Sequence, residues 1–199
     1  MEIEKMPGLV IAYHGCDALI AERIVSGKEK LKGSKNLYDW LGHGQYFWEN
    51  SPQRAFDWAT ELCERNTSSG ISNPDVIGAV IDLGCCLNLM DIACIELVKY
   101  AYQDLVSSGA YDKLPQNSNV GESNDLLLRY LDCAVIEYLH SISYPVFETK
   151  FDSVRGVFVE GNPIYPNAGF REKTHIQICV VDPKCILGYF KPLHFIERN

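Results

Sequence analysis

The sequence predicts an α+β fold, because strand patterns stand at both ends of the chain and helical patterns fill its middle. Short apolar or β-branched runs mark the strands, and apolar residues three or four positions apart mark the helices. The composition, 47% hydrophobic and 22% charged over 199 residues, is that of one ordinary globular domain. We therefore expect a single domain spanning residues 1–199.

The strands are predicted from short runs that favour a pleated, buried surface. Val76–Leu83 is the clearest case, since valine and isoleucine dominate it. Leu9–Tyr13 is a purely apolar run closed by an aromatic, and Gln45–Trp48 is an aromatic one. In chain order the predicted strands are residues 9–13, 45–48, 76–83, 87–89, 154–160, 174–181 and 185–190.

The helices are predicted from the spacing of apolar residues and from their end signals. Asp17 is a suitable N-cap for the first helix, and Gly27 ends it. Pro52 favours the first turn of the second helix. In chain order the predicted helices are residues 17–25, a segment from 52 onward, 91–106 and 125–143, and the predicted loops are 28–44, 66–74, 111–124 and 160–170.

Charge and hydropathy exclude several classes of protein. The net charge of −8 argues against docking on nucleic acid by bulk electrostatics. The four lysines of Lys28–Lys35 are predicted to lie in a solvated loop, although a local patch of this kind can still contact an anion. No run approaches the ~18 apolar residues of a membrane span, and Met1–Lys5 lacks a signal-peptide core. A cytoplasmic protein without membrane contact is expected.

The eight cysteines predict reduced thiols rather than a disulfide framework, because their spacing is irregular. Cys85 and Cys86 are adjacent and do not form a CxxC pair. Without a second Cys or His pair at ligand spacing, no metal site is expected.

Two short motifs carry the functional signal. Tyr13-His14-Gly15 ends the first predicted strand, and Gly42-His43-Gly44-Gln45-Tyr46-Phe47-Trp48 contains the second. Glycines flank both, which lets a ligand approach the backbone closely. A third residue, Ala55, follows Tyr46 by nine positions in the next predicted helix.

These residues resemble the ADP-ribosyltransferase superfamily, on its diphtheria-toxin and poly(ADP-ribose) polymerase-like branch. In that branch a Trp/Tyr-His-Gly motif ends the first strand, a Gly-x-Gly-x-Tyr-Phe motif forms a later one, and a helix with an alanine nine residues beyond the tyrosine follows. Thr174–Phe190 resembles the family's last pair of strands. The resemblance implies a split β-sheet with a helical insertion, residues 87–154, between the N- and C-terminal strands.

The resemblance also implies a site for NAD, as substrate and without a metal. Catalysis would fall to His14, Tyr46 and a third residue on the penultimate strand. His14 would bond the adenosine-side ribose, the Gly15 backbone would bind the nicotinamide carboxamide, and Tyr46 would stack on the nicotinamide ring. The residues expected to contact NAD are Tyr13, His14, Gly15, Gly44, Tyr46 and Ala55.

The third catalytic residue departs from the polymerase pattern, which places a glutamate there. Thr174–Cys179 contains no glutamate, and His175, Gln177 and Cys179 share one face of the predicted strand. Because some members of the branch use Gln or Asp, Gln177 is the expected residue, with Glu172 as the alternative. Glutamine would favour a single transfer over chain growth, since the glutamate also activates the acceptor hydroxyl.

The resemblance finally implies a macromolecular acceptor, either protein or nucleic acid, with the Lys28–Asp39 and Glu160–Phe170 loops at the rim of the site. Small members are often toxins or phage-defence proteins, for which an inhibitory antitoxin partner is expected. Two other functions stay open. One is a non-catalytic module that binds NAD or ADP-ribose, and the other is a thiol hydrolase that uses His14 and Cys16.

Overall fold

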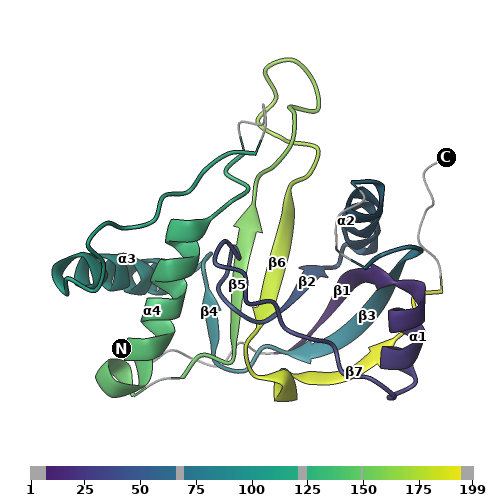
Figure 1. Ribbon diagram of the computed structural model, residues 1–199, viewed down its shortest axis with the longest axis horizontal. Helices are drawn as coiled ribbons and strands as arrows, with labels where there is room; N and C mark the ends of the chain where they lie inside the picture. Colours follow the sequence, from purple (N-terminus) through teal and green to yellow (C-terminus); the bar gives the residue numbers. More distant parts are fainter. Residues whose placement is uncertain (1–7, 66–69, 121–124, 149, 194–199) are drawn as a thin grey trace.

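The computed structural model describes residues 8–65, 70–120, 125–148 and 150–193 (Figure 1). Within these ranges seven strands form one mixed sheet in the order β4-β5-β6-β2-β1-β3-β7, accompanied by four α-helices. The α+β prediction is therefore confirmed. The strands are β1 (Leu9–Asp17), β2 (Gln45–Glu49), β3 (Pro74–Asp82), β4 (Cys86–Asn88), β5 (Ser153–Phe158), β6 (His175–Val180) and β7 (Ile186–Phe190), and the helices are α1 (Ala18–Val25), α2 (Pro52–Glu64), α3 (Ile92–Ser107) and α4 (Tyr130–Phe147).

The sheet narrows at the seam between β1 and β2. β1 is paired with β3 along its whole length, from Leu9↔Asp82 to Asp17↔Pro74. It is paired with β2 only at Ala12↔Glu49 and Tyr13↔Trp48. β2 is paired on its other side with β6, so the sheet consists of two well-paired halves joined by a short contact. Figure 1 shows the consequence, since β5 and β6 stand upright while β3 and β7 lie nearly across the view.

Strand alternation separates the cores on the two faces of the sheet. One face carries Ala12, Phe47 and Ile178, which pack with Ala21 and Ile24 of α1. The opposite face carries two clusters, one against α2 and one against α3 and α4. The segment expected as a helical insertion thus contains two helices that bury their apolar sides on the β4-β5-β6 half of the sheet.

The helix expected at 125–143 begins at Tyr130 instead and runs to Phe147, so its predicted bounds are wrong. Leu128 cannot join it, because its backbone N–H and carbonyl both bond Ser118. The Asn117 side-chain oxygen accepts the N–H of Leu131 at 2.8 Å. This residue of the preceding loop thereby caps a backbone N–H in the first turn of α4. The N-cap predicted at Asp17 is confirmed, since its carboxylate accepts the N–H of Leu19. Asp91 caps α3 in the same way, through the N–H of Ala93.

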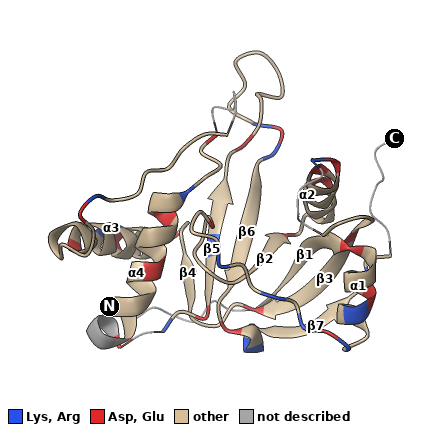
Figure 2. Ribbon diagram, viewed as in Figure 1, with Lys and Arg blue, Asp and Glu red and all other residues tan. Residues whose placement is uncertain are grey.

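The expectations for residues 1–5, and for parts of the 66–74 and 111–124 loops, fall on residues outside the described ranges. The four lysines between positions 28 and 35 are exposed, as predicted for a solvated loop. Blue basic and red acidic positions are interspersed along the described chain in Figure 2. No helix in the described ranges has the length and apolar character that crossing a bilayer requires.

Candidate functional site

The seam between β1 and β2 leaves backbone groups of β1 facing a gap. The N–H of Asn50 donates to the carbonyl of Ile11 at 3.0 Å, so Ile11, Tyr13 and Gly15 direct their N–H and C=O groups toward β2. The ladder ends at Tyr13↔Trp48. Gly15 therefore has no ladder partner on β2 in the described part of the chain, and one donor and one acceptor of its backbone point into the seam.

His14 lines the seam on the side of β1. Its Nδ1 lies 2.7 Å from the carbonyl oxygen of Tyr46, and its ring contacts Phe47 and Trp58 at centroid distances of 5.9 and 6.3 Å. Burial lowers the pKa of His14, so the imidazole is neutral near pH 7. Because a carbonyl only accepts, Nδ1 carries the proton, and Nε2 is left as an acceptor.

Gly15 is also the point where α2 meets the sheet. A Cβ at this position would lie 2.0 Å from the carbonyl oxygen of Ala55 and 3.0 Å from the Cβ of Ala59. Both alanines are fully buried. Only glycine fits here, and the first motif is in direct contact with the alanine nine residues after Tyr46.

Tyr46 holds the loop that precedes its own strand. Its hydroxyl donates to the carbonyl of Gly42 at 2.7 Å and accepts the N–H of Leu41 at 2.8 Å. Burial raises the pKa of this phenol well above its usual range, so the hydroxyl keeps its proton. The resemblance implies a Tyr46 ring that stacks on a ligand. The structure adds hydrogen bonds of the hydroxyl to the preceding loop, which the motif did not reveal.

The glycine-rich part of the second motif is packed tightly between β6 and α4. A Cβ on Gly44 would lie 2.5 Å from the carbonyl oxygen of Val180, and the backbone of Gly44 pairs with Ser34 in both directions. Glu137 of α4 accepts the N–H of His43 at 2.7 Å and contacts the His43 Nδ1 at 3.1 Å. No sequence pattern linked α4 to this loop, because the two are far apart along the chain.

Gln177 lies on β6 directly opposite Trp48 of β2, and Tyr46 stands opposite Cys179. Tyr46, Trp48 and Gln177 therefore share one face of the sheet, the face covered by α2, α3 and α4. His14 belongs by alternation to the other face, and it meets this group through the Tyr46 carbonyl and the Trp58 ring. The three predicted catalytic residues thus lie on the neighbouring strands β1, β2 and β6, and within the described residues no hydrogen bond or ring contact joins their side chains.

Glu172 lies in the loop before β6 rather than on the strand. Its side chain is exposed, and its carboxylate accepts the N–H of Asn162 at 3.3 Å. A backbone bond from Glu172 to Asn162 closes the same loop. The contacts of Glu172 are therefore those of a loop-closing residue.

A buried polar cluster lies beside Gln177, and sequence reasoning missed it. The Nδ1 of His175 donates to the carbonyl of Lys173 at 2.6 Å, while its Nε2 is buried without a partner among the described residues. Burial lowers the pKa of His175 to about 4. Glu160 lies 3.5 Å from the same Nδ1 and 3.6 Å from Arg54, and burial raises the pKa of its carboxyl.

The thiol of Cys16 is unsuited to nucleophilic chemistry. It packs among the buried apolar residues beneath α1. Burial, and the nearby carboxylate of Asp75, raise its pKa to about 12. A reactive thiol needs the opposite shift, so the arrangement gives no support to a thiol hydrolase.

All eight cysteines are free, and six of them are buried. Among the residues that the structure describes, no three His, Cys, Asp or Glu side chains converge in a way that could hold a metal ion. Comparison with protein families, curated proteins and solved structures found no match to this chain.

Proposed function

We propose that this protein is an NAD-dependent mono-ADP-ribosyltransferase with a split sheet of the kind found in that superfamily. The main support for this proposal is the backbone geometry at Gly15. The backbone of Gly15 presents a donor and an acceptor to a seam that also contains a neutral histidine and adjoins Gln177. The residues of both sequence motifs meet at this seam.

The seam matches the polar groups of NAD. A carboxamide has an N–H donor and a carbonyl acceptor side by side, which complement the C=O and N–H of Gly15. The Nε2 of His14 accepts a hydroxyl proton from the adenosine-side ribose. Tyr46 shapes the wall of the site by holding Leu41 and Gly42 in place. Neither contact requires a metal.

The proposed reaction breaks the bond between the ribose C1′ and the nicotinamide nitrogen, and the electron pair leaves with nicotinamide. Positive charge then develops on the ribose, and a nearby carbonyl dipole stabilises it. The amide oxygen of Gln177 supplies this dipole. The acceptor nucleophile bonds to C1′ and releases its proton to solvent, so the products are ADP-ribosylated acceptor, nicotinamide and a proton.

Glutamine at this position favours one transfer per acceptor site. An amide cannot take a proton from a weakly acidic sugar hydroxyl, so growth of a poly(ADP-ribose) chain is disfavoured. The acceptor is a protein or nucleic-acid group that is already nucleophilic, and the 28–39 and 160–170 loops help to select it. A cytoplasmic toxin or defence role, restrained by an antitoxin protein, is consistent with such an activity.

A non-catalytic module that binds NAD or ADP-ribose is the second candidate. The neutral Gln177 favours it, because an uncharged amide stabilises a ribosyl cation less than a carboxylate does. NAD binding without release of nicotinamide would support this second function and contradict the first.

The test is to incubate the purified protein with NAD labelled in its adenosine part, together with cell extract, and to measure nicotinamide release and the labelled fraction. His14→Ala should abolish nicotinamide release while the protein stays folded. His140→Ala is the matched control, since His140 is a half-buried histidine on α4 that packs against Phe151. Equal loss in both variants, or full activity in His14→Ala, would overturn the assignment of the site.

A further inference from the structure

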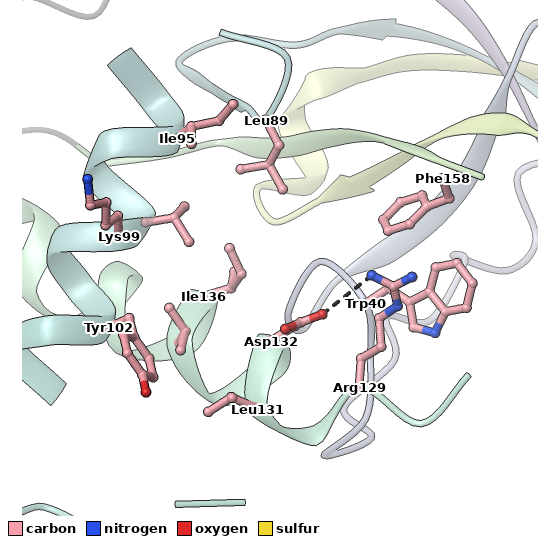
Figure 3. A pocket seen from close by; sticks show the side chains of 12 residues that line it. Trp40, Leu89, Ile95, Lys99, Tyr102, Arg129, Leu131, Asp132, Ile136 and Phe158 are labelled. Atoms are coloured by element: carbon pink, nitrogen blue, oxygen red, sulfur yellow. Dashed lines mark hydrogen bonds and ion pairs between the residues drawn. The ribbon is translucent and has the colours of Figure 1, made fainter. Parts of the chain in front are cut away.

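A hollow lies apart from the seam, between α3, α4 and β5, and has a volume of about 430 Å³ (Figure 3). Its walls are mostly apolar, and the aliphatic side chains of Leu89, Ile95, Val98, Val135 and Ile136 form part of them. A volume of this size is within the range of about 300–1,000 Å³ that is usual for small-ligand pockets. No local sequence pattern indicates this hollow, because its walls come from segments that are far apart in the chain.

One end of the hollow is polar and rigid. The guanidinium carbon of Arg129 lies 4.2 Å from the ring centroid of Trp40 and 5.0 Å from that of Phe158. Arg129 Nε donates to the carbonyl of Leu126 at 3.0 Å, and Nη1 lies 3.4 Å from a carboxylate oxygen of Asp132. Figure 3 shows Asp132 and Arg129 facing each other in front of Trp40. The guanidinium plane is therefore fixed by its aromatic and polar contacts.

The structure assigns this hollow to a nucleobase. Apolar walls suit the ring of a base, and a guanidinium plane is a common stacking surface for one. Arg129 offers its remaining N–H donors at this end. Asp132 accepts the Asn117 amide at 2.7 Å on one carboxylate oxygen and pairs with Arg129 on the other, and its remaining lone pairs complete a mixed donor and acceptor edge like that of a base. A fatty acyl chain would leave this edge unused, and a simple carboxylate would be repelled by Asp132.

The opposite side of the hollow suits the sugar and phosphate of the same nucleotide. Lys99 and Tyr102 of α3 both line the hollow, and the Lys99 side chain is 59% exposed. Its ammonium contacts only Glu96 within the described chain, at 3.2 Å, so it can turn toward a phosphate. We therefore place the base at the Arg129 end and the phosphate near Lys99. In this orientation the edge of the base meets Arg129 and Asp132, and the phosphate meets the ammonium.

The site stands independently of the proposed function, since neither NAD nor Gln177 takes part in it. Its position is nevertheless notable, because Phe158 is the cross-strand partner of His175 on the strand that carries Gln177. The base can belong to a free nucleotide or to a single-stranded nucleic acid. The hollow would recognise the base in the same way in both cases. The two sources are distinguished by comparing the affinity of the protein for a mononucleotide with its affinity for an oligonucleotide.

The test titrates the full chain, without NAD, with the four ribonucleoside monophosphates and with a single-stranded oligonucleotide, by calorimetry and by NMR of the Trp40 indole N–H. We expect saturable binding and a shift of the Trp40 signal, because this N–H is fixed to the Leu127 carbonyl beside the hollow. An oligonucleotide that binds more tightly than every mononucleotide identifies a strand as the source, and equal affinities identify a free nucleotide.

Two variants check the location. Val98→Phe fills the hollow and Arg129→Gln removes the charged stacking plane, and each should weaken binding by about tenfold or more. Val157→Phe is the matched control, because Val157 is exposed and points to the other face of β5. Absence of saturable binding at millimolar nucleotide, an unmoved Trp40 signal, or equal binding by both variants and the wild type would overturn the proposal.

Discussion

The Nδ1 of His14 lies 2.7 Å from the carbonyl oxygen of Tyr46, at the point where β1 and β2 separate. If the pairing of β1 with β2 continued, Gly15 would stand opposite Tyr46, and the Gly15 N–H would donate to this carbonyl oxygen. The imidazole occupies that acceptor instead. A single contact thereby fixes the tautomer of His14 and keeps the backbone of Gly15 available to a ligand.

The first prediction concerns exchange of the Gly15 amide with solvent deuterium. The amides of Ala12 and His14 belong to the β1–β3 ladder, whereas that of Gly15 faces the seam. We expect the Gly15 amide to exchange faster than both, and nicotinamide to slow it selectively. Site-resolved NMR exchange measures this directly. Equal protection of all three amides in the free protein would mean that the seam is closed.

The second prediction tests the contact between Gly15 and α2. Gly15→Ala places a Cβ 2.0 Å from the carbonyl oxygen of Ala55, so the helix must move. We expect the free energy of unfolding to fall by about 2 kcal/mol or more, as overpacking of a tight core does. Gly188→Ala is the control, since a Cβ there meets no atom within 4 Å. Urea unfolding of both variants compares the two costs, and similar values would contradict the packing argument.

The third prediction concerns the hydroxyl of Tyr46. Tyr46→Phe leaves the N–H of Leu41 and the carbonyl of Gly42 without their partner, which costs about 1–3 kcal/mol for buried groups. Exchange of the Leu41 amide should accelerate as the loop loosens. Tyr189→Phe is the matched control, because Tyr189 is a partly buried tyrosine in the core under α1, on the face opposite Tyr46. Unchanged stability and exchange in Tyr46→Phe would show that the hydroxyl does not hold the loop.

The order of strands and helices was predictable because each has a local signal. The β-branched run at Val76–Leu83 and the N-cap at Asp17 act within a few residues, and both are confirmed. The start of α4 was mispredicted because Asn117 and Ser118 set it, and they lie outside the helical pattern. A helix boundary set by a neighbouring loop is not visible in the periodicity of the helix itself.

The candidate site was predictable only in part, for a similar reason. Glycines at 15 and 44 were visible in the motifs, and each does lie where a side chain would clash. Two features of the site depend on residues that are distant in the chain: the hydrogen bond from the His43 N–H to Glu137, and the burial of His175. Such contacts depend on tertiary packing, so the roles of Glu137 and His175 could not be predicted from their local sequences.

The fourth prediction is a loss of stability in acid that depends on His175. Its pKa falls from 6.5 in the unfolded chain to about 4 in the folded protein, so the unfolded state binds more protons between these values. The stabilisation is complete above pH 6.5 and is lost as the pH falls toward 4, a change of about 3 kcal/mol. The lowered pKa values of His14 and His140 act in the same direction, while the raised pKa of Glu160 opposes them.

The variant for this measurement is His175→Phe, which keeps a ring among Trp40, Trp48 and Phe158 but cannot be protonated. Urea unfolding from pH 7 to pH 4 should give a shallower decline for the variant than for the wild type. A constant offset between the two curves, with the same slope, would mean that His175 does not titrate in this range.

The last prediction separates Gln177 from Glu172 as the third catalytic residue. Under the proposed transfer, Gln177→Ala removes the amide oxygen beside the ribose, so nicotinamide release should fall by about 100-fold or more while NAD still binds. Glu172→Ala should leave nicotinamide release within about twofold of the wild type, because its carboxylate is exposed and bonds the N–H of Asn162 in the loop. Single-turnover release of nicotinamide and equilibrium NAD binding, measured on both variants, give the comparison. Loss of release in Glu172→Ala alone would move the catalytic role to the loop, and undiminished release in both variants would remove it from β6 altogether.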